Sequence, residues 1–349
     1  MTRMEDVAPS EELAQGNAAL EPDATILRVD DLHVAFDVGR RSVRAVDGVS
    51  FSIRRGEIFG IVGESGCGKS ATLRALIGLL PQTGAHTSGR VSYGGQNLLG
   101  LGERALRRVR GAEISMVFQD PMTFLNPVLR VSEQIEEALR QHTPLKRAER
   151  RARAVELMRL VGIALPERRL REYPHQFSGG MRQRVLLAIA LACGPKVLLA
   201  DEPTTALDVT IQDQILKLLK RLRDELGMSI VLVSHDLGVI AQMCERVAVM
   251  YAGQVVESAP VRELIRNPRH PYTVGLLNSL PRIDVDSRYL IPIPGAPPSM
   301  TELAPGCRFA DRCPLVLDEC RGWKTELLEA APEHRSRCLR HETLGGGDV

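Results

Sequence analysis

Residues 63–70, Gly-Glu-Ser-Gly-Cys-Gly-Lys-Ser, constrain the fold more than any other feature of this chain. They match the phosphate-loop pattern G-x-x-x-x-G-K-[ST] and lie between an apolar run, residues 57–62, and a helix-like stretch, residues 69–80. This order predicts a loop whose backbone N–H groups surround nucleotide phosphates, with Lys69 at the β- and γ-phosphates and Ser70 on Mg²⁺. The residues expected to contact the nucleotide are Gly63, Glu64, Ser65, Gly66, Cys67, Gly68, Lys69, Ser70 and Ala71.

The pattern of apolar residues predicts an α/β fold with a parallel core. Residues 26–36 and 43–53 alternate apolar and polar side chains, as half-buried strands do. Downstream, short apolar runs alternate with helix-like segments, which favours a parallel sheet. The helical, charge-rich stretch between Gln119 and Ser178 predicts a separate lobe. Prolines accumulate after residue 267, which marks the end of the core.

Composition and charge exclude several classes of protein. The formal net charge of +2 gives no basis for nucleic-acid binding. The first 25 residues are acidic and lack an apolar segment, so they predict a flexible tail rather than a signal peptide. The longest apolar stretch, residues 185–200, is broken by Gly-Pro-Lys and is too short for a membrane-spanning helix of about 20 residues. We therefore expect a cytosolic chain that reaches a membrane only through a partner.

Two further segments suggest a place for phosphate chemistry. Asp201 and Glu202 follow a short apolar run and are expected at the end of a buried strand. Residues 178–180, Ser-Gly-Gly, form a turn before a helix, and helix N-termini bind anions. Each has an ordinary alternative, since an acidic pair is common at solvated turns and a serine often only caps a helix.

The order of these motifs resembles that of ATPase subunits of ATP-binding-cassette (ABC) machines, over residues 26–258. The resemblance implies ATP hydrolysis with Mg²⁺. It implies that Asp201 helps to hold Mg²⁺ and that Glu202 is the general base for the attacking water. It also implies that Gln119 contacts Mg²⁺ or that water, and that His235 contacts the γ-phosphate.

The same resemblance implies a dimer of cassettes that close on shared ATP. The turn formed by Ser178, Gly179 and Gly180 contacts the γ-phosphate held by the opposite subunit in this family. Gln183 and Asp208 belong to the same nucleotide-contacting set. An aromatic ring stacks on adenine in the family, and Phe36 is the candidate here, with a core or edge-strand role as the alternative.

Residues 119–127 and 267–281 look like the corresponding segments of oligopeptide and dipeptide importer ATPases. This resemblance implies three parts: a flexible tail (1–25), an ABC ATPase domain (26–266, with the helical lobe at about 120–177), and a C-terminal extension (267–349). It implies a motor subunit at the cytoplasmic face of the membrane, with two permeases, a second ATPase subunit and an extracytoplasmic solute-binding protein. Alternatives are import of nickel or another small solute, and a soluble, non-transport ABC ATPase.

Four of the seven cysteines cluster near the C-terminus with the spacing C-x5-C-x6-C-x17-C: Cys307, Cys313, Cys320 and Cys338. In a reducing compartment such a cluster favours metal over disulfides. The wide gaps lack the close pairs usual for structural zinc and favour a [4Fe–4S] cluster, as do the similar tails of the importer family. A zinc site in which His334 replaces one thiolate is the second hypothesis, and four free cysteines the third.

Overall fold

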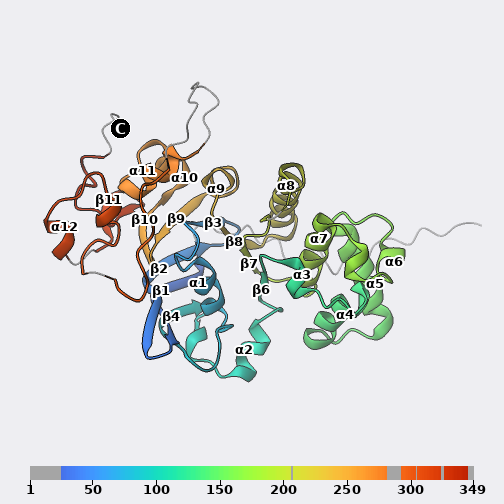
Figure 1. Cartoon of the computed structure of the whole chain (residues 1–349). Helices are drawn as coiled ribbons and strands as arrows, with labels where there is room; N and C mark the ends of the chain where they lie inside the picture. Colours follow the sequence, from blue (N-terminus) through green and yellow to red (C-terminus); the bar gives the residue numbers. More distant parts are fainter. Residues whose placement is uncertain (1–24, 206, 281–291, 304, 324–325, 345–349) are drawn as a thin grey trace, which may run out of the picture.

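The computed structural model describes residues 25–205, 207–280, 292–303, 305–323 and 326–344. Their strands form two sheets, and Figure 1 shows a helical lobe and the C-terminal extension at opposite ends of the molecule, with the sheets between them. The predicted flexible tail lies almost entirely outside the described residues. The described part contains no helix that is both long and apolar enough to cross a membrane.

The smaller sheet is antiparallel and confirms the two strands expected from alternation. Its order is β2-β1-β4-β5, with β1 at its centre. Val34 of β1 pairs with Val46 of β2, and both side chains are fully buried. The four strands are β1 (Thr25–Val38), β2 (Arg41–Arg54), β4 (Ala85–Tyr93) and β5 (Gln96–Asn97).

The larger sheet has the order β11-β12-β10-β9-β3-β8-β7-β6 and a parallel centre, as predicted. Strands β9, β3, β8, β7 and β6 are parallel, whereas β10, β12 and β11 are added antiparallel at one edge. The last two belong to the C-terminal extension, so this part of the extension continues the sheet of the core. The strands are β3 (Ile58–Val62), β6 (Ile114–Val117), β7 (Val197–Asp201), β8 (Ser229–Ser234), β9 (Arg246–Tyr251), β10 (Gln254–Pro260), β11 (Leu328–Ala331) and β12 (His334–Ser336).

Both faces of the larger sheet are buried, as its apolar strands require. In β3, Phe59 and Ile61 face the core shared with the antiparallel sheet, whereas Ile58 and Val62 face the core that continues into the helices. Helices outside the lobe are α1 (Lys69–Leu76), α2 (Glu103–Val109), α8 (Val209–Leu226), α9 (Leu237–Met243), α10 (Val261–Arg266), α11 (Pro271–Asn278) and α12 (Glu319–Gly322), with 3-10 turns at Leu98–Gly100 and Ala310–Arg312. A further 3-10 turn, Pro174–Gln176, lies in the lobe before α7.

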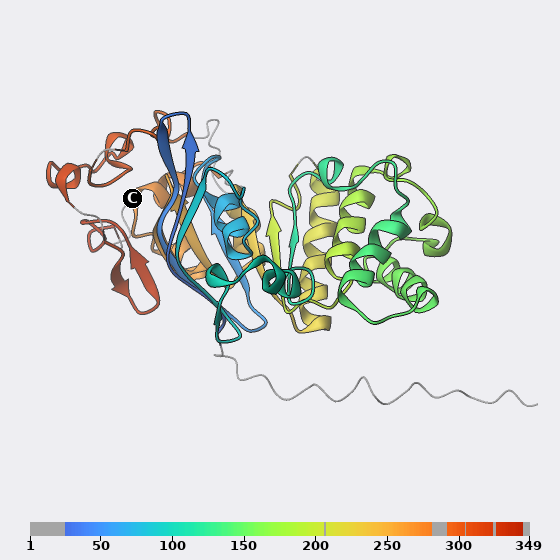
Figure 2. The same ribbon diagram turned by 90° about the horizontal axis from the view of Figure 1, so that it is seen from below.

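The helical lobe consists of α3 to α7 and stands beside the β6–β7 edge of the larger sheet (Figure 2). Its apolar residues follow a helical period: Val131, Ile135 and Leu139 of α4 are all buried. Its helices are α3 (Pro121–Phe124), α4 (Val131–His142), α5 (Arg147–Leu160), α6 (Pro166–Arg169) and α7 (Gly179–Ala190).

Candidate functional site

The phosphate loop connects β3 to α1, as the sequence predicts, and two of its glycines are required by close backbone approaches. A Cβ atom on Gly63 would lie 2.1 Å from the carbonyl oxygen of Met250. A Cβ on Gly68, whose φ is +104°, would lie 2.2 Å from the carbonyl oxygen of Ala45. Neither contact is possible with a side chain present. The loop is therefore fixed by the strand β9 and the antiparallel sheet on either side of it.

Lys69 and Ser70 begin α1 and point into hydrogen-bond networks. The Lys69 ammonium donates to the carbonyl oxygens of Gly63 (2.7 Å) and Glu64 (3.0 Å). The Ser70 hydroxyl donates to Oδ1 of Asp201 at 2.9 Å, across 131 residues of sequence. Burial raises the pKa of Asp201, an effect that the Ser70 hydrogen bond opposes. These two oxygen ligands lie together at a place where a hard divalent cation would relieve the cost of the buried carboxylate.

Glu202 has three hydrogen-bond partners at one carboxylate oxygen. Oε2 contacts Gln119 Nε2 at 3.2 Å, Thr205 Oγ1 at 2.9 Å and His235 Nδ1 at 3.1 Å. Its other oxygen lies 3.8 Å from the Lys69 ammonium. The backbone of Glu202 has a φ of +45°, which is strained for a residue with a side chain. The residue is thus held at the end of β7 in one orientation by groups from four segments.

These groups line one open cavity of about 490 Å³, which is within the usual size range of small-molecule sites. The structure brings together nine of the residues named from the sequence, and it adds two that sequence reasoning missed, Ala45 and Thr205. Thr205 was missed because a threonine three residues after an acidic pair has no distinctive spacing. The lining residues are Ala45, Ser65, Gly66, Gly68, Lys69, Ser70, Ala71, Gln119, Glu202, Thr205 and His235.

The other expected nucleotide contacts do not line this cavity. Phe36 is half-buried in β1, beside the core of the antiparallel sheet. Ser178 caps α7 by accepting a hydrogen bond from the Met181 N–H, and Asp208 caps α8 in the same way. Gln183 is 1% exposed. Their roles in nucleotide binding therefore remain predictions, and those of residues 178–180 require a second chain.

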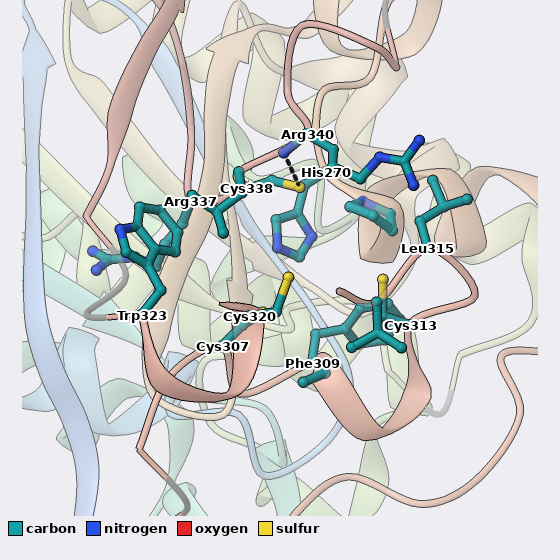
Figure 3. A pocket seen from close by; sticks show the side chains of 14 residues that line it. His270, Cys307, Phe309, Cys313, Leu315, Cys320, Trp323, Arg337, Cys338 and Arg340 are labelled. Atoms are coloured by element: carbon teal, nitrogen blue, oxygen red, sulfur yellow. Dashed lines mark hydrogen bonds between the residues drawn. The ribbon is translucent and has the colours of Figure 1, made fainter. Parts of the chain in front are cut away.

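The four cysteines of the C-terminal extension surround a second cavity (Figure 3). The four cysteines come from separate short elements: Cys307 and Cys313 lie on either side of the 3-10 turn Ala310–Arg312, Cys320 lies in α12, and Cys338 follows β12. All seven cysteines of the chain are free thiols. His270 and Phe309 complete the wall on the core side. The cavity is small, about 20 Å³, which is room for one water molecule.

The electrostatic environment of three of these thiols disfavours charge. Burial and the neighbouring thiols raise the pKa of Cys307 and Cys313, and that of Cys338 to about 12. Backbone N–H groups two residues further on oppose this at all three sulfurs, for example Arg340 N to Cys338 Sγ at 3.4 Å. In the described part of the chain, no three His, Cys, Asp or Glu side chains are placed to hold a metal ion. The expected iron–sulfur site is thus not formed in this structure.

His334 does not support the alternative zinc site. It is fully buried in β12, where Nε2 contacts Oε1 of Glu257 at 2.7 Å. Among the described residues it is His270, not His334, that lines the cysteine cavity. His334 instead joins the extension to β10 of the core.

Comparisons with known proteins place this geometry in context. Residues 46–205 match the family described as "ABC transporter", and residues 256–320 match "Oligopeptide/dipeptide transporter, C-terminal region". The second match includes three of the four tail cysteines and begins within β10, before the boundary at residue 267 expected from composition.

Curated relatives carry peptide-transport names. The oligopeptide transport ATP-binding protein OppD of Mycobacterium tuberculosis is 53% identical over 92% of this chain and 53% of its own length. The dipeptide transport ATP-binding protein DppD of Bacillus subtilis is 51% identical over 84% of this chain and 88% of its own. The chain therefore spans about half the length of the mycobacterial relative and most of the Bacillus one.

Solved structures of ABC cassettes share the fold. A dimeric cassette in a post-hydrolysis state, bound to ADP and Pi, has a TM-score of 0.60 and 33% sequence identity, over 68% of this chain and 99% of its own. The protein cbiO1 of Clostridium perfringens, part of the ABC transporter complex cbiONQ, has a TM-score of 0.59 and 29% identity, over 69% of this chain and 91% of its own.

Proposed function

Since the chain belongs to the ABC transporter family of ATP-binding cassettes, with the C-terminal region of the oligopeptide/dipeptide transporters, we propose that it is the ATP-hydrolysing motor subunit of a peptide importer. The observation that carries the proposal is the position of Glu202. Its carboxylate lies on the wall of the phosphate-loop cavity and is oriented by Gln119, Thr205 and His235. This is where a general base for a water attacking the γ-phosphate has to be.

The remaining residues at the cavity have separate roles in phosphoryl transfer. The loop N–H groups and the Lys69 ammonium bind and neutralise the phosphates. Ser70 and Asp201 would hold Mg²⁺, which supplies charge stabilisation to the phosphate oxygens. Glu202 accepts the proton of the attacking water, and Gln119 and His235 keep its carboxylate turned toward the cavity. In this scheme Lys69 releases the loop carbonyls of Gly63 and Glu64 when nucleotide enters.

The opening of the cavity supports a composite site shared by two cassettes. Ser178, Gly179 and Gly180 begin α7 and lie outside the cavity of their own chain. Gly180 has room only for a hydrogen, because a Cβ there would lie 2.6 Å from a methyl group of Ile211 on α8. The glycines keep this turn close to α8, and the N–H groups at the start of α7 would then bind phosphate held by a partner cassette. That partner is either a second copy of this chain or a sister subunit. The relative known as a dimer gives the same expectation.

The test of the hydrolytic function is the substitution Glu202→Gln. An amide keeps the size of the side chain and its hydrogen bonds but cannot accept the proton, so turnover should fall by roughly 10²–10⁴. Binding of ATP should persist. The matched control is Glu225→Gln on the exposed side of α8, where the carboxylate lies 3.9 Å from the exposed Arg221 guanidinium. Hydrolysis by Glu202→Gln at the parent rate would refute the base assignment.

The helical lobe is the proposed contact with the two permeases at the cytoplasmic face of the membrane, while the solute-binding protein acts from the other side. The stretch after Gln119 exposes two large apolar side chains, Phe124 (44% exposed) and Val128 (76% exposed). Exposed apolar side chains of this size are typical of an interface. Val128→Asp should reduce transport but not basal ATPase activity. The control is Leu165→Asp on the same lobe (64% exposed), and equal transport by both variants would argue against this surface.

For the C-terminal extension we propose a [4Fe–4S] cluster, with Cys307, Cys313, Cys320 and Cys338 as ligands. Four thiols share one cavity, and three of them accept backbone N–H groups, which stabilise thiolates. A single zinc ion needs all its sulfurs within about 2.3 Å of one point. The thiolates of a four-iron cluster bind different iron atoms and therefore lie further apart. The absence of a site for a single ion among these thiols thus argues against zinc more strongly than against a cluster. The cavity between the thiols is about 20 Å³, so a bound cluster would require them to lie further apart than they do in this structure.

Anaerobic purification tests this proposal. We expect a brown protein with about four irons per chain, and Cys307→Ser should lose most of the iron. Metal that binds only the folded state at 100 times its Kd stabilises it by about 2.7 kcal/mol, so the variant should also unfold more easily in the extension. Cys193→Ser in the lobe, whose thiol contacts Ala138 O, is the control. Colourless protein with one zinc per chain would favour zinc, and metal-free protein with a folded extension would exclude both.

A further inference from the structure

The second residue of the phosphate loop, Glu64, is held by a residue 248 positions later in the sequence. Its carboxylate forms a two-pronged ion pair with Arg312: Nη1 lies 2.7 Å from Oε2, and Nη2 lies 3.0 Å from Oε1. Such paired geometry fixes orientation as well as distance. The nucleotide cavity and the C-terminal extension are therefore joined at the loop itself.

Arg312 is a rigid anchor for this contact. Its side chain is 6% exposed, and it also donates to the carbonyl oxygens of Pro294 (2.9 Å) and Ile293 (3.3 Å) and to the Tyr251 hydroxyl (3.2 Å). Its guanidinium stacks on the rings of Tyr251 and Phe309. The hydrogen bonds that Arg312 donates to Glu64 raise the pKa of Arg312, so it is a permanent cation. Little freedom remains for the carboxylate that it holds.

A second residue of the extension holds the backbone of Glu64. The Glu64 N–H donates to the Tyr272 hydroxyl at 2.9 Å, and Tyr272 is fully buried at the start of α11. Burial raises the pKa of Tyr272, so the phenol stays neutral and accepts this hydrogen bond. Its ring packs on those of Tyr251 and Phe309.

We propose that Arg312 and Tyr272 are positioning residues that clamp the phosphate loop of their own chain in its nucleotide-accepting form. The reason lies in the contacts of Lys69, whose ammonium donates to the carbonyl oxygens of Gly63 and Glu64. When Lys69 turns to the phosphates, the loop loses both contacts at the moment its N–H groups have to stay in place. The clamp supplies two contacts to Glu64 that do not depend on Lys69. The proposal rests on ATP binding at this loop, as argued above.

The experiment is MgATP binding and steady-state hydrolysis by the full chain with Arg312→Ala, Arg312→Lys and Tyr272→Phe. Loss of a charge-assisted contact to the loop should weaken MgATP binding and raise KM by roughly tenfold, with kcat within about twofold. Lysine should recover part of the loss, and Tyr272→Phe should give a smaller one. The control is Arg321→Ala, which breaks an exposed ion pair with Asp311 in the same extension and should change nothing.

A double variant separates a local clamp from general damage to the extension. If Arg312 acts through Glu64, then Glu64→Ala with Arg312→Ala should bind MgATP no worse than Arg312→Ala alone. Losses that multiply, or an Arg312→Ala variant that binds like the parent, would overturn the proposal. If the parent protein itself does not bind MgATP, the proposed function fails rather than the clamp.

Discussion

The two cavities of this molecule differ in how completely the protein alone builds them. In the nucleotide cavity, the candidate catalytic side chains are already held by other protein groups. Lys69 donates to a loop carbonyl, and Ser70 donates to Asp201. Three side chains contact the carboxylate of Glu202. In the cysteine cavity, four thiols face about 20 Å³ of space without a site for an ion. A site on strand ends inherits its geometry from the sheet, whereas a site on loops needs a further source of order.

The largest effect expected from this comparison comes from removing the Lys69 ammonium from the nucleotide cavity. Lys69→Ala removes the ammonium that neutralises phosphate and holds the loop carbonyls, so ATP turnover should fall by about 10²–10³. If the two cavities differ as described, the metal content of the extension should not change. Lys217→Ala, an exposed residue of α8 paired with Asp213, is the control. Loss of metal in Lys69→Ala would show that the cavities are one cooperative unit.

Sequence reasoning named most of the residues that line the phosphate-loop cavity because the signals there are local. The loop pattern, the acidic pair and the alternation of β1 and β2 each occupy a few consecutive residues. It missed β4, where only Val91 is buried and the alternation is lost. It made the first helix too long, since α1 ends at Leu76 and Gly78 then takes a φ of +62° before Pro81 is reached.

Contacts between distant segments were beyond prediction. Strand β12 has three residues, too few for a pattern, yet Glu257 of β10 pairs with Ser336 in it. The contact between Arg312 and Glu64 could not be predicted, because the two residues are 248 positions apart and neither belongs to a motif that includes the other. The clustering of the cysteines in the sequence identified them as candidate ligands. It could not predict the distances between their sulfur atoms in the folded chain. The difference between the two cavities is therefore visible only in the folded chain.

An effect on stability rather than on turnover tests how the wall of the cysteine cavity responds to acid. Complete burial lowers the pKa of His270 to about 3, well below its ordinary value of 6.5. The unfolded chain thus binds a proton that the folded chain refuses, and stability is lost as pH falls from about 6.5 toward 3. The loss is roughly 1.4 kcal/mol per pH unit in that window. Denaturant unfolding of metal-free protein at several pH values measures it.

The variant for this measurement is His270→Asn. Asparagine can still accept the Tyr272 N–H that His270 Nδ1 accepts at 3.1 Å, but it does not titrate. The steep part of the pH dependence should therefore flatten, at the cost of about 1 kcal/mol at neutral pH for lost packing. His175→Asn, at an exposed site in the lobe, is the control. If the pH dependence of the free energy of unfolding is as steep in His270→Asn as in the parent, then His270 can be hydrated or protonated in the folded protein.

The smallest expected effect concerns the stability that the protein loses by burying the Asp201 carboxylate before Mg²⁺ binds. Asp201 is 2% exposed, and its burial raises its pKa, so at neutral pH the folded protein holds a charge that water would solvate better. Asp201→Asn removes that charge while the amide oxygen can still accept the Ser70 hydroxyl. The free energy of unfolding without Mg²⁺ should rise by up to about 1 kcal/mol, and Mg²⁺-dependent hydrolysis should be lost. Asp213→Asn, exposed on α8, is the control. A less stable Asp201→Asn variant would show that the buried carboxylate supports the fold of the nucleotide cavity rather than costing stability.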